Sequence, residues 1–231
     1  MRLGRRARVL LLVAATLALA LGVSAVVVTT VRRDDSCASD RRNAEAAPAS
    51  GGVSAGPVAF FLGDSYTTGF GLPDPGEGFA YGLADLEGWN ATVEGFPGTG
   101  YATQGPCGGN AFIQRLARLP ADADVVIIEG GLNDAIFGVP PATLAADASG
   151  LLAAVRMAAP DARIVVLGAA DVLPEARSRV LAANAALRAA ASDAGATYVD
   201  LADLEFTTTD GKHPTVAGHA LIAEAVSDAL H

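Results

Sequence analysis

Residues 58–66, VAFFLGDSY, join a run of five apolar residues to a glycine, an aspartate and a serine. A continuous apolar run of this length is typical of a strand that is buried on both faces of a parallel sheet. Ser65 follows the carboxyl end of this strand, where parallel sheets present their ligands. The stretch therefore predicts a parallel sheet with a hydroxyl group at its functional edge.

The rest of the chain repeats this alternation of strand and helix. Four more strand candidates follow, at 92–96, 125–129, 164–168 and 197–201, and most of them are runs of apolar or β-branched residues. Five segments show the apolar spacing of helices, at 79–87, 110–119, 142–159, 174–194 and 215–230. Such alternation predicts right-handed crossovers and a three-layer α/β domain, with its ligand crevice formed by the loops that follow the strands.

The N-terminal quarter of the chain has a different composition. Residues 9–31 form 23 uncharged positions drawn from Ala, Leu, Val, Gly, Ser and Thr. At about 1.5 Å per residue, a helix of this length spans a hydrocarbon core of about 30 Å. Four arginines within residues 1–8 favour a cytoplasmic N-terminus. We expect a signal anchor at 9–31, a flexible stalk at 32–56, and a globular domain at 57–231 outside the cytoplasm.

The alternative for this segment is a cleaved signal peptide. Val23-Ser24-Ala25 offers a small-residue cleavage site, and cleavage there would give a secreted protein. The apolar run continues past this site to Val31, however, and signal peptides carry apolar regions of only about 7–15 residues. An uncleaved, single-pass membrane anchor is therefore the favoured interpretation.

Charge and cysteine content limit the partners. Residues 57–231 hold 8 basic and 21 acidic residues, a formal net charge of −13, which provides no electrostatic footprint for nucleic acid. Cys37 and Cys107 are the only cysteines of the chain and lack metal-ligand spacing. In an oxidising compartment they could pair, remain separate thiols, or pair between molecules through Cys37.

A late Asp/His pair supplies what Ser65 would need to react. A serine hydroxyl is a poor nucleophile unless a base takes its proton. Asp210 precedes His213 by three residues, so its carboxylate can reach Nδ1 of the imidazole while Nε2 faces the serine. Taken singly, these residues also fit simpler interpretations, since Ser65 suits a helix N-cap and Asp210 an Asx-turn.

Two further segments offer donors for a developing oxyanion. Asn133 lies in GLND (131–134) after the third strand, and its side-chain amide can donate to an oxyanion. Gly98 lies in FPGTG (96–100) after the second strand, where a glycine lets a backbone N–H approach closely. Each is also compatible with an ordinary turn or cap. Together with Ser65 and the Asp/His pair, they gather at one edge of the predicted sheet, which favours a nucleophilic hydrolase.

These four segments resemble, in order, the sequence blocks of the SGNH hydrolases, the GDSL-type esterase and lipase superfamily, over about residues 58–230. The resemblance implies a flavodoxin-like sheet of five parallel strands and no metal or organic cofactor. It implies a Ser65–Asp210–His213 triad, with the Ser65 and Gly98 N–H groups and the Asn133 side chain as the oxyanion hole.

The chain departs from the family pattern in two places. Tyr66 replaces the usual leucine, at a position that we expect not to touch the chemistry. Residues 93–95, VEG, stand where Asn-x-Gly is common before the oxyanion glycine. Outside the blocks, we expect His219 to pack in or on the last helix, and Trp89 and Tyr101 either to line a pocket or to pack in the core.

The sequence therefore predicts an extracytoplasmic serine esterase that hydrolyses small, acetyl-type esters through an acyl-enzyme. Its expected location outside the cytoplasm suggests that the substrates are esters of the cell envelope, such as O-acetylated polysaccharide. Two alternatives stay open. The same residues would perform acyl transfer if a glycan hydroxyl replaced water, and a non-catalytic carbohydrate-binding module could share the fold.

Overall fold

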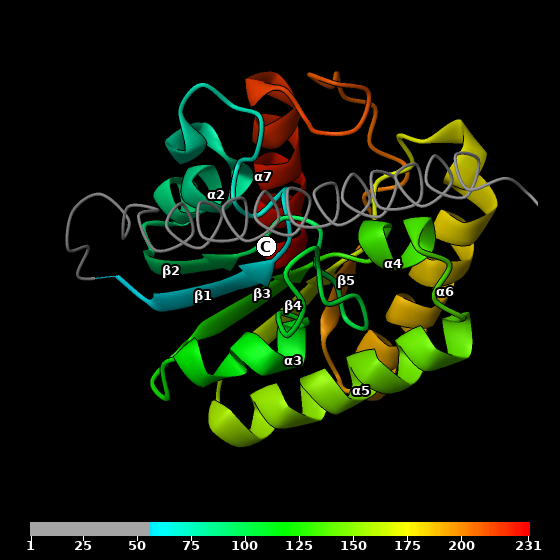
Figure 1. Ribbon diagram of the computed structural model, residues 1–231. Coiled ribbons are helices and arrows are strands. Elements are labelled where there is room, and N and C mark those ends of the chain that lie inside the picture. The colour runs from blue at the N-terminus through cyan, green and yellow to red at the C-terminus, as the bar shows by residue number, and fades with distance from the viewer. Residues whose placement is uncertain (1–55) are drawn as a thin grey trace, which may run out of the picture. The chain divides into compact units, whose positions relative to one another are not determined.

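Five parallel strands form one sheet in the computed structural model, which describes residues 56–231 (Figure 1). The predicted anchor, nearly all of the stalk and Cys37 lie outside the described residues. The strands, in chain order, are β1 (Val58–Gly63), β2 (Asn90–Gly95), β3 (Val125–Glu129), β4 (Arg163–Leu167) and β5 (Thr197–Val199). Their order in the sheet is β2-β1-β3-β4-β5.

The central strands are apolar because both of their faces are covered. Strand β1 lies between β2 and β3, and Phe60 of β1 aligns with Thr92 on one side and Val126 on the other. Every residue of β3 is buried, and so is every residue of β1 except Val58. Continuous apolar runs suit strands of this kind. The predicted three-layer α/β fold with five parallel strands is confirmed.

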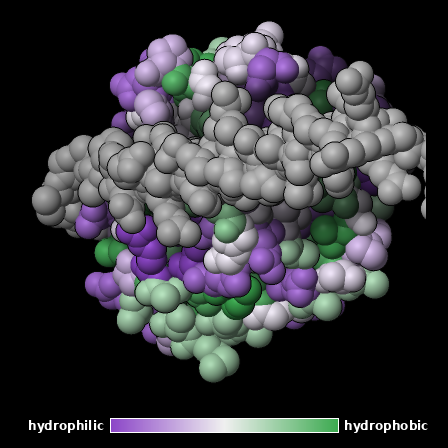
Figure 2. All heavy atoms as spheres, in the orientation of Figure 1, coloured by the Kyte–Doolittle hydropathy of each residue, from purple (hydrophilic) through white to green (hydrophobic). Residues whose placement is uncertain are grey.

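Helices cover the sheet on both faces (Figure 1). Helices α2 (Phe79–Glu87) and α7 (Val216–Leu230) pack together on one face. Helices α3 (Phe112–Arg115), α5 (Pro141–Ala158) and α6 (Arg177–Asp193) lie on the other, with α5 against both α3 and α6. Weakly hydrophobic residues gather at the bottom of Figure 2, where α5 exposes alanines to solvent. Three 3-10 turns complete the elements: η1 (Pro75–Glu77), η2 (Leu116–Arg118) and η3 (Pro174–Ala176).

The structure differs from the predicted elements in two places. The helix expected at 110–119 is one turn of α-helix, α3, which tightens into η2 at Arg115. Between the strand expected at 125–129 and the helix expected at 142–159, the structure has an additional short helix, α4 (Leu132–Ile136), whose N-cap residue Gly131 has φ 109°. Segments of four or five helical residues are too short for an apolar period to appear in the sequence.

The turn after β1 has room only for glycine at its first position. A β-carbon on Gly63 would lie 1.9 Å from Oγ1 of Thr67 and 2.8 Å from the carbonyl oxygen of Glu129, at the end of β3. This close passage places Ser65 at the carboxyl edge of the sheet, where β1 lies between β2 and β3.

Within residues 56–231, no helix is both long enough and apolar enough to cross a membrane.

Candidate active site

Ser65, His213 and Asp210, which the sequence predicts to act together, lie in hydrogen-bond contact. Oγ of Ser65 is 3.1 Å from Nε2 of His213, and Nδ1 of His213 is 2.7 Å from Oδ2 of Asp210. Ser65 and His213 are buried, whereas the Asp210 side chain is 51% exposed. The side chains run from hydroxyl through imidazole to carboxylate, the order that a serine nucleophile requires.

The Asp210 carboxylate makes two kinds of contact that the sequence left as alternatives. Its Oδ1 accepts the backbone N–H groups of Lys212 at 3.0 Å and His213 at 2.8 Å, which is an Asx-type turn. Its Oδ2 contacts the His213 ring. Gly211, with φ 84°, lets the chain turn tightly between them. One oxygen therefore shapes the turn while the other orients the imidazole.

The surroundings keep His213 neutral and Asp210 ionised. Burial lowers the pKa of His213 below its ordinary value, and the nearby positive charge of Lys212 lowers this pKa further, against the opposing effect of the hydrogen bond that Nδ1 of His213 donates to Asp210. Hydrogen bonds from the backbone and ring of His213 hold the pKa of Asp210 well below its usual range. With Asp210 as an ionised acceptor, the His213 proton resides on Nδ1, and Nε2 can accept a proton.

Two backbone N–H groups near the Ser65 hydroxyl have no acceptor in the part of the chain that the structure describes. Within residues 56–231, the N–H groups of Ser65 and Gly98 make no hydrogen bond to the protein. Gly98 has φ 77°, a left-handed conformation that favours glycine. Unpaired N–H groups that are fixed near a nucleophile are the donors that an oxyanion needs.

Asn133 links the segments that carry these two N–H groups. Its Nδ2 donates to Oδ2 of Asp64 and to the carbonyl oxygen of Thr99, at 2.9 Å in both cases. Asp64 precedes Ser65, and Thr99 follows Gly98, so the structure brings all three predicted oxyanion donors together. Both amide hydrogens of Asn133 have protein acceptors here, and a substrate oxyanion would share one of them.

Asp134 shapes the loop after β2, although its place in GLND (131–134) indicated only an ordinary turn or cap. Its carboxylate accepts the backbone N–H groups of Tyr101 at 3.0 Å, Ala102 at 3.1 Å and Thr103 at 2.9 Å, together with the Thr103 hydroxyl at 2.8 Å. A β-carbon on Gly100 would lie 2.3 Å from this carboxylate. The loop that presents Gly98 is therefore wrapped around Asp134.

A pair of buried carboxyl groups underlies the nucleophile turn. Burial raises the pKa of Asp64 to about 6, although the backbone N–H of Tyr66 donates to its Oδ1 at 3.0 Å. Burial also raises the pKa of Glu129 well above its ordinary value, and the charge of Asp64 adds to this rise. Oε2 of Glu129 accepts the Thr67 hydroxyl at 2.9 Å. Asp64 is thus a second group, besides His213, that titrates close to the site.

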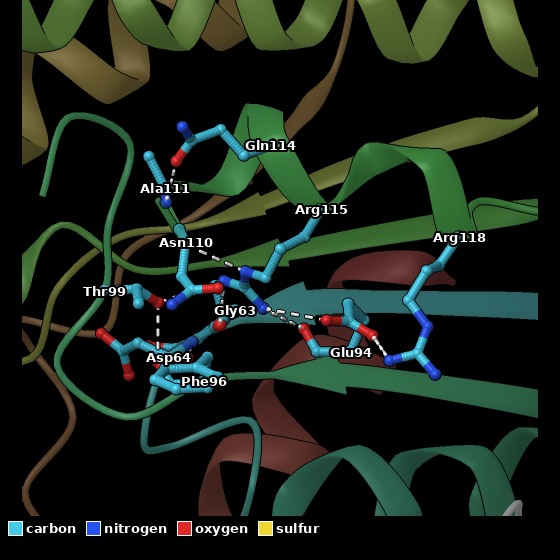
Figure 3. Close-up of polar contacts among 11 residues, drawn as sticks. Gly63, Asp64, Glu94, Phe96, Thr99, Asn110, Ala111, Gln114, Arg115 and Arg118 are labelled. Atoms are coloured by element: carbon cyan, nitrogen blue, oxygen red, sulfur yellow. Dashed lines mark hydrogen bonds and ion pairs between the residues drawn. The ribbon is translucent and has the colours of Figure 1, made fainter. Parts of the chain in front are cut away.

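A buried arginine ties the ends of β1 and β2 together, as Figure 3 shows. The Arg115 guanidinium donates to the carbonyl oxygens of Gly63 at 2.8 Å, Glu94 at 2.9 Å and Asn110 at 3.0 Å. It also donates to Oγ1 of Thr99 at 3.1 Å. Arg115 therefore fixes the backbone on which Ser65 and Gly98 are mounted. Sequence reasoning missed it, because an arginine in a short helix carries no signal of these distant partners.

Tyr66 contacts the proposed base, contrary to the expectation that this position does not touch the chemistry. Its hydroxyl donates to the carbonyl oxygen of Lys212 at 2.5 Å, and its ring centroid is 6.2 Å from that of His213. The side chain thus joins the turn that carries Ser65 to the loop that carries His213. A leucine here would pack against the histidine but would donate no hydrogen bond.

The other aromatic and histidine residues singled out in the sequence pack in the interior. His219 is buried, accepts the Phe79 N–H at its Nδ1 and stacks on the Phe79 ring. Trp89 packs against Phe61, and Tyr101 packs against Phe112. These contacts favour core packing over pocket lining for Trp89 and Tyr101.

No cluster of three or more metal-ligating side chains occurs within residues 56–231. Cys107 lies in the loop between β2 and α3, and Cys37, the partner in one of the alternatives that the sequence leaves open, falls outside the described residues.

Solved structures share this fold at low sequence identity. A carbohydrate esterase family 2 enzyme with a carbohydrate-binding domain, from Corynascus thermopiles (Myceliophthora fergusii), aligns with a TM-score of 0.66 and 21% identity over 78% of this chain and 67% of that chain. A protein from Lactobacillus plantarum aligns with a TM-score of 0.66 and 22% identity over 75% of this chain and 96% of that chain. A family two carbohydrate esterase from Clostridium thermocellum, in complex with cellohexaose, aligns with a TM-score of 0.63 and 18% identity over 74% of this chain and 62% of that chain.

The sequence itself identifies the family. Among curated proteins, none is similar enough to count as a match. The profile of the GDSL-like Lipase/Acylhydrolase family, by contrast, matches residues 61–221, which include all of the predicted site residues. The chain therefore belongs to the GDSL-like lipase/acylhydrolase family.

Proposed function

We propose that this protein is a serine esterase that hydrolyses small, acetyl-type esters through an acyl-enzyme on Ser65. The observation that carries the proposal is the contact of a buried serine hydroxyl with a buried imidazole, which in turn contacts an ionised carboxylate. Membership of an acylhydrolase family supports the same reaction class. The unpaired N–H groups of Ser65 and Gly98 supply donors for the oxyanion that this reaction forms.

The reaction follows from the geometry in two steps. Oγ of Ser65 attacks the ester carbonyl carbon while Nε2 of His213 takes the hydroxyl proton. The carbonyl oxygen becomes an oxyanion that the Ser65 and Gly98 N–H groups and the Asn133 amide stabilise. The intermediate collapses, the bond to the alcohol breaks, and His213 returns its proton to the alcohol. Water then attacks the acyl-enzyme in the same manner, releases the acid and restores Ser65.

The proposed substrate is an O-acetylated glycan, reached from outside the cytoplasm. Support for the glycan comes from structural neighbours that are carbohydrate esterases, although at this identity they share only the fold. Support for the location comes from the uncharged segment 9–31 and the arginines before it. Intact-mass measurement of the mature chain tests the location, because cleavage near residue 25 would remove the anchor.

The function is tested with the full-length chain on p-nitrophenyl esters from acetyl to palmitoyl and on acetylated xylan. We expect kcat/KM to be highest for the acetyl ester, and acetate to be released from the glycan. If the wild type turned over none of these substrates faster than Ser65→Ala does, the proposed esterase function would be rejected. If an added sugar acceptor diverted most of the acyl groups into a new ester, the transferase alternative would be favoured instead.

The pH profile should show activity that is lost at acid pH. Protonated His213 cannot accept the Ser65 proton, so kcat/KM falls as pH decreases through the His213 pKa. Burial and Lys212 lower this pKa, so we expect the midpoint to lie below about 6.5, with a plateau at neutral pH. Lys212→Met should raise the midpoint, because a positive charge near the imidazole is removed. A midpoint above pH 7 in the wild type would contradict this assignment.

Tyr66→Phe should lower both kcat and stability by modest amounts. The variant removes the hydrogen bond to the Lys212 carbonyl and keeps the ring, so we expect stability to fall by about 1 kcal/mol and kcat by about threefold to tenfold. Tyr81→Phe is the matched control, since the Tyr81 hydroxyl has no partner within residues 56–231. Thermal unfolding and steady-state kinetics measure the two effects. A kcat equal to that of Tyr81→Phe would show that the hydrogen bond does not position His213.

A further inference from the structure

Phe70 is exposed beside the active site, whereas most phenylalanines of the described residues are in the core. Phe70 is 47% exposed. Within residues 56–231, Phe137 is the one phenylalanine that is more exposed, at 69%. A single exposed apolar residue is common on protein surfaces. Phe70 differs because its ring lies next to the proposed base, at the rim of the candidate active site, where aromatic side chains often line a ligand site.

The backbone holds Phe70 in this place. Its N–H donates to the carbonyl oxygen of Ser65 at 2.9 Å. The flanking Gly69 and Gly71 have φ values of 66° and 88°, a left-handed conformation that side chains rarely adopt. A β-carbon on Gly71 would lie 3.3 Å from Oγ1 of Thr209, so the turn also fits closely against the loop that carries Asp210. The ring is therefore presented by a constrained turn that is anchored on Ser65 itself.

The Phe70 ring contacts the His213 imidazole at a tilt. The two ring centroids are 4.8 Å apart with an interplanar angle of 51°. In the proposed reaction, His213 gives its proton to the oxygen of the departing alcohol, so that oxygen must lie next to the imidazole. A ring that contacts the imidazole and is open to solvent consequently borders the alcohol of the ester rather than the oxyanion donors at Gly98 and Asn133.

The border of this surface is polar. Residues 209–212 on the neighbouring loop are Thr, Asp, Gly and Lys, and the Asp210 side chain is half exposed. Along the chain, exposed Pro73 and Asp74 follow the turn that carries Phe70. A long alkyl alcohol would need a continuous apolar channel, which these residues do not provide. A pyranose ring combines a flat face of C–H groups with hydroxyl groups at its edge, and it matches an aromatic face with a polar border.

We propose that Phe70 is the platform for a pyranose alcohol, so that the ester bond to be cleaved joins a small acyl group to a sugar ring stacked on Phe70. This subsite rests on the proposed esterase function. The alcohol of the ester is placed next to Phe70 because His213, which Phe70 contacts, gives its proton to the alcohol oxygen in that reaction. The proposal assigns recognition of the sugar to the Phe70 ring, and this stacking needs no other part of the protein.

Kinetics with a constant acetyl group and a varied alcohol test the platform. Methyl 6-O-acetyl-glucopyranoside is compared with ethyl acetate, using the full-length wild type, Phe70→Ala and Phe70→Tyr. We expect Phe70→Ala to lower kcat/KM for the sugar ester about threefold to tenfold more than for ethyl acetate, since one aromatic face is lost. Phe70→Tyr should restore the wild-type preference. Met157→Ala, which removes a side chain that is 85% exposed on α5, is the control and should not alter the preference.

Binding separates failure of the platform from failure of the esterase. Affinity for the same sugar ester is measured in Ser65→Ala with and without Phe70→Ala, where turnover plays no part. A weaker Kd in the double variant supports the platform even if the wild type hydrolyses neither ester. An unchanged Kd would overturn the platform. An equal loss of kcat/KM on both esters would also overturn it, because Phe70 would then act only by supporting His213.

Discussion

Replacing Ser65 by alanine should lower kcat for an acetyl ester by a factor on the order of 10⁴ to 10⁶. The hydroxyl lies 3.1 Å from the imidazole, and its removal leaves the site with no atom to form the acyl-enzyme. Oxyanion donors and substrate binding remain, so a residual rate about 10³-fold above that in water is expected. Burst kinetics should disappear along with the acyl-enzyme.

The loss should come from chemistry and not from unfolding. Ser65 makes its other side-chain contact with Oδ1 of Asp64, at a long 3.4 Å, so alanine disturbs little else. Ser149→Ala, at an exposed position on α5, is the matched control and should have wild-type activity. Steady-state rates and mass spectrometry of the acyl-enzyme measure the effect. Retention of more than a few per cent of wild-type activity by Ser65→Ala would identify a different nucleophile.

Replacing His213 by alanine should have nearly the same effect, on the order of 10⁴ to 10⁶ in kcat. Without the imidazole, nothing accepts the Ser65 proton or returns it to the alcohol. The two losses should not add, because serine and histidine act as one unit. The double variant Ser65→Ala/His213→Ala is therefore expected to be no slower than either single variant.

Two controls separate this effect from packing. The His213 ring contacts the rings of Tyr66 and Phe70, so alanine leaves a gap there; His213→Asn fills more of this space and should be equally inactive. His231→Ala removes an exposed histidine that pairs with Glu87 and should leave activity unchanged. If His213→Asn retained activity or the double variant were much slower than both single variants, His213 would not be the base for Ser65.

The parts of this structure that the sequence predicts are those with local signals. Runs such as 125–129 are apolar at each position before Glu129, so a buried parallel strand is visible without knowledge of its neighbours. The candidate residues Ser65, Asn133, Asp210 and His213 follow strands or sit in short motifs. Their convergence follows from the parallel arrangement of the strands.

The supporting contacts have no such signals. The Tyr66 hydroxyl reaches a carbonyl group 146 residues away, and Arg115 reaches one 52 residues away. Both bonds end on backbone oxygens, which every residue type provides, so the partner leaves no mark in the sequence. Asp134 was visible beside Asn133, but its acceptance of three successive N–H groups depends on the path of a loop that only the fold determines.

The 148 residues that separate Ser65 from His213 also affect when the site comes into being. The serine lies in the turn after the first strand of the domain, whereas the base lies just before its last helix. A chain that has assembled only its first four strands would carry the hydroxyl without its base. Contacts of such long sequence separation are the slow ones to form during folding. Hydrolysis should therefore begin only with the last stage of folding, and would report that the domain has folded completely.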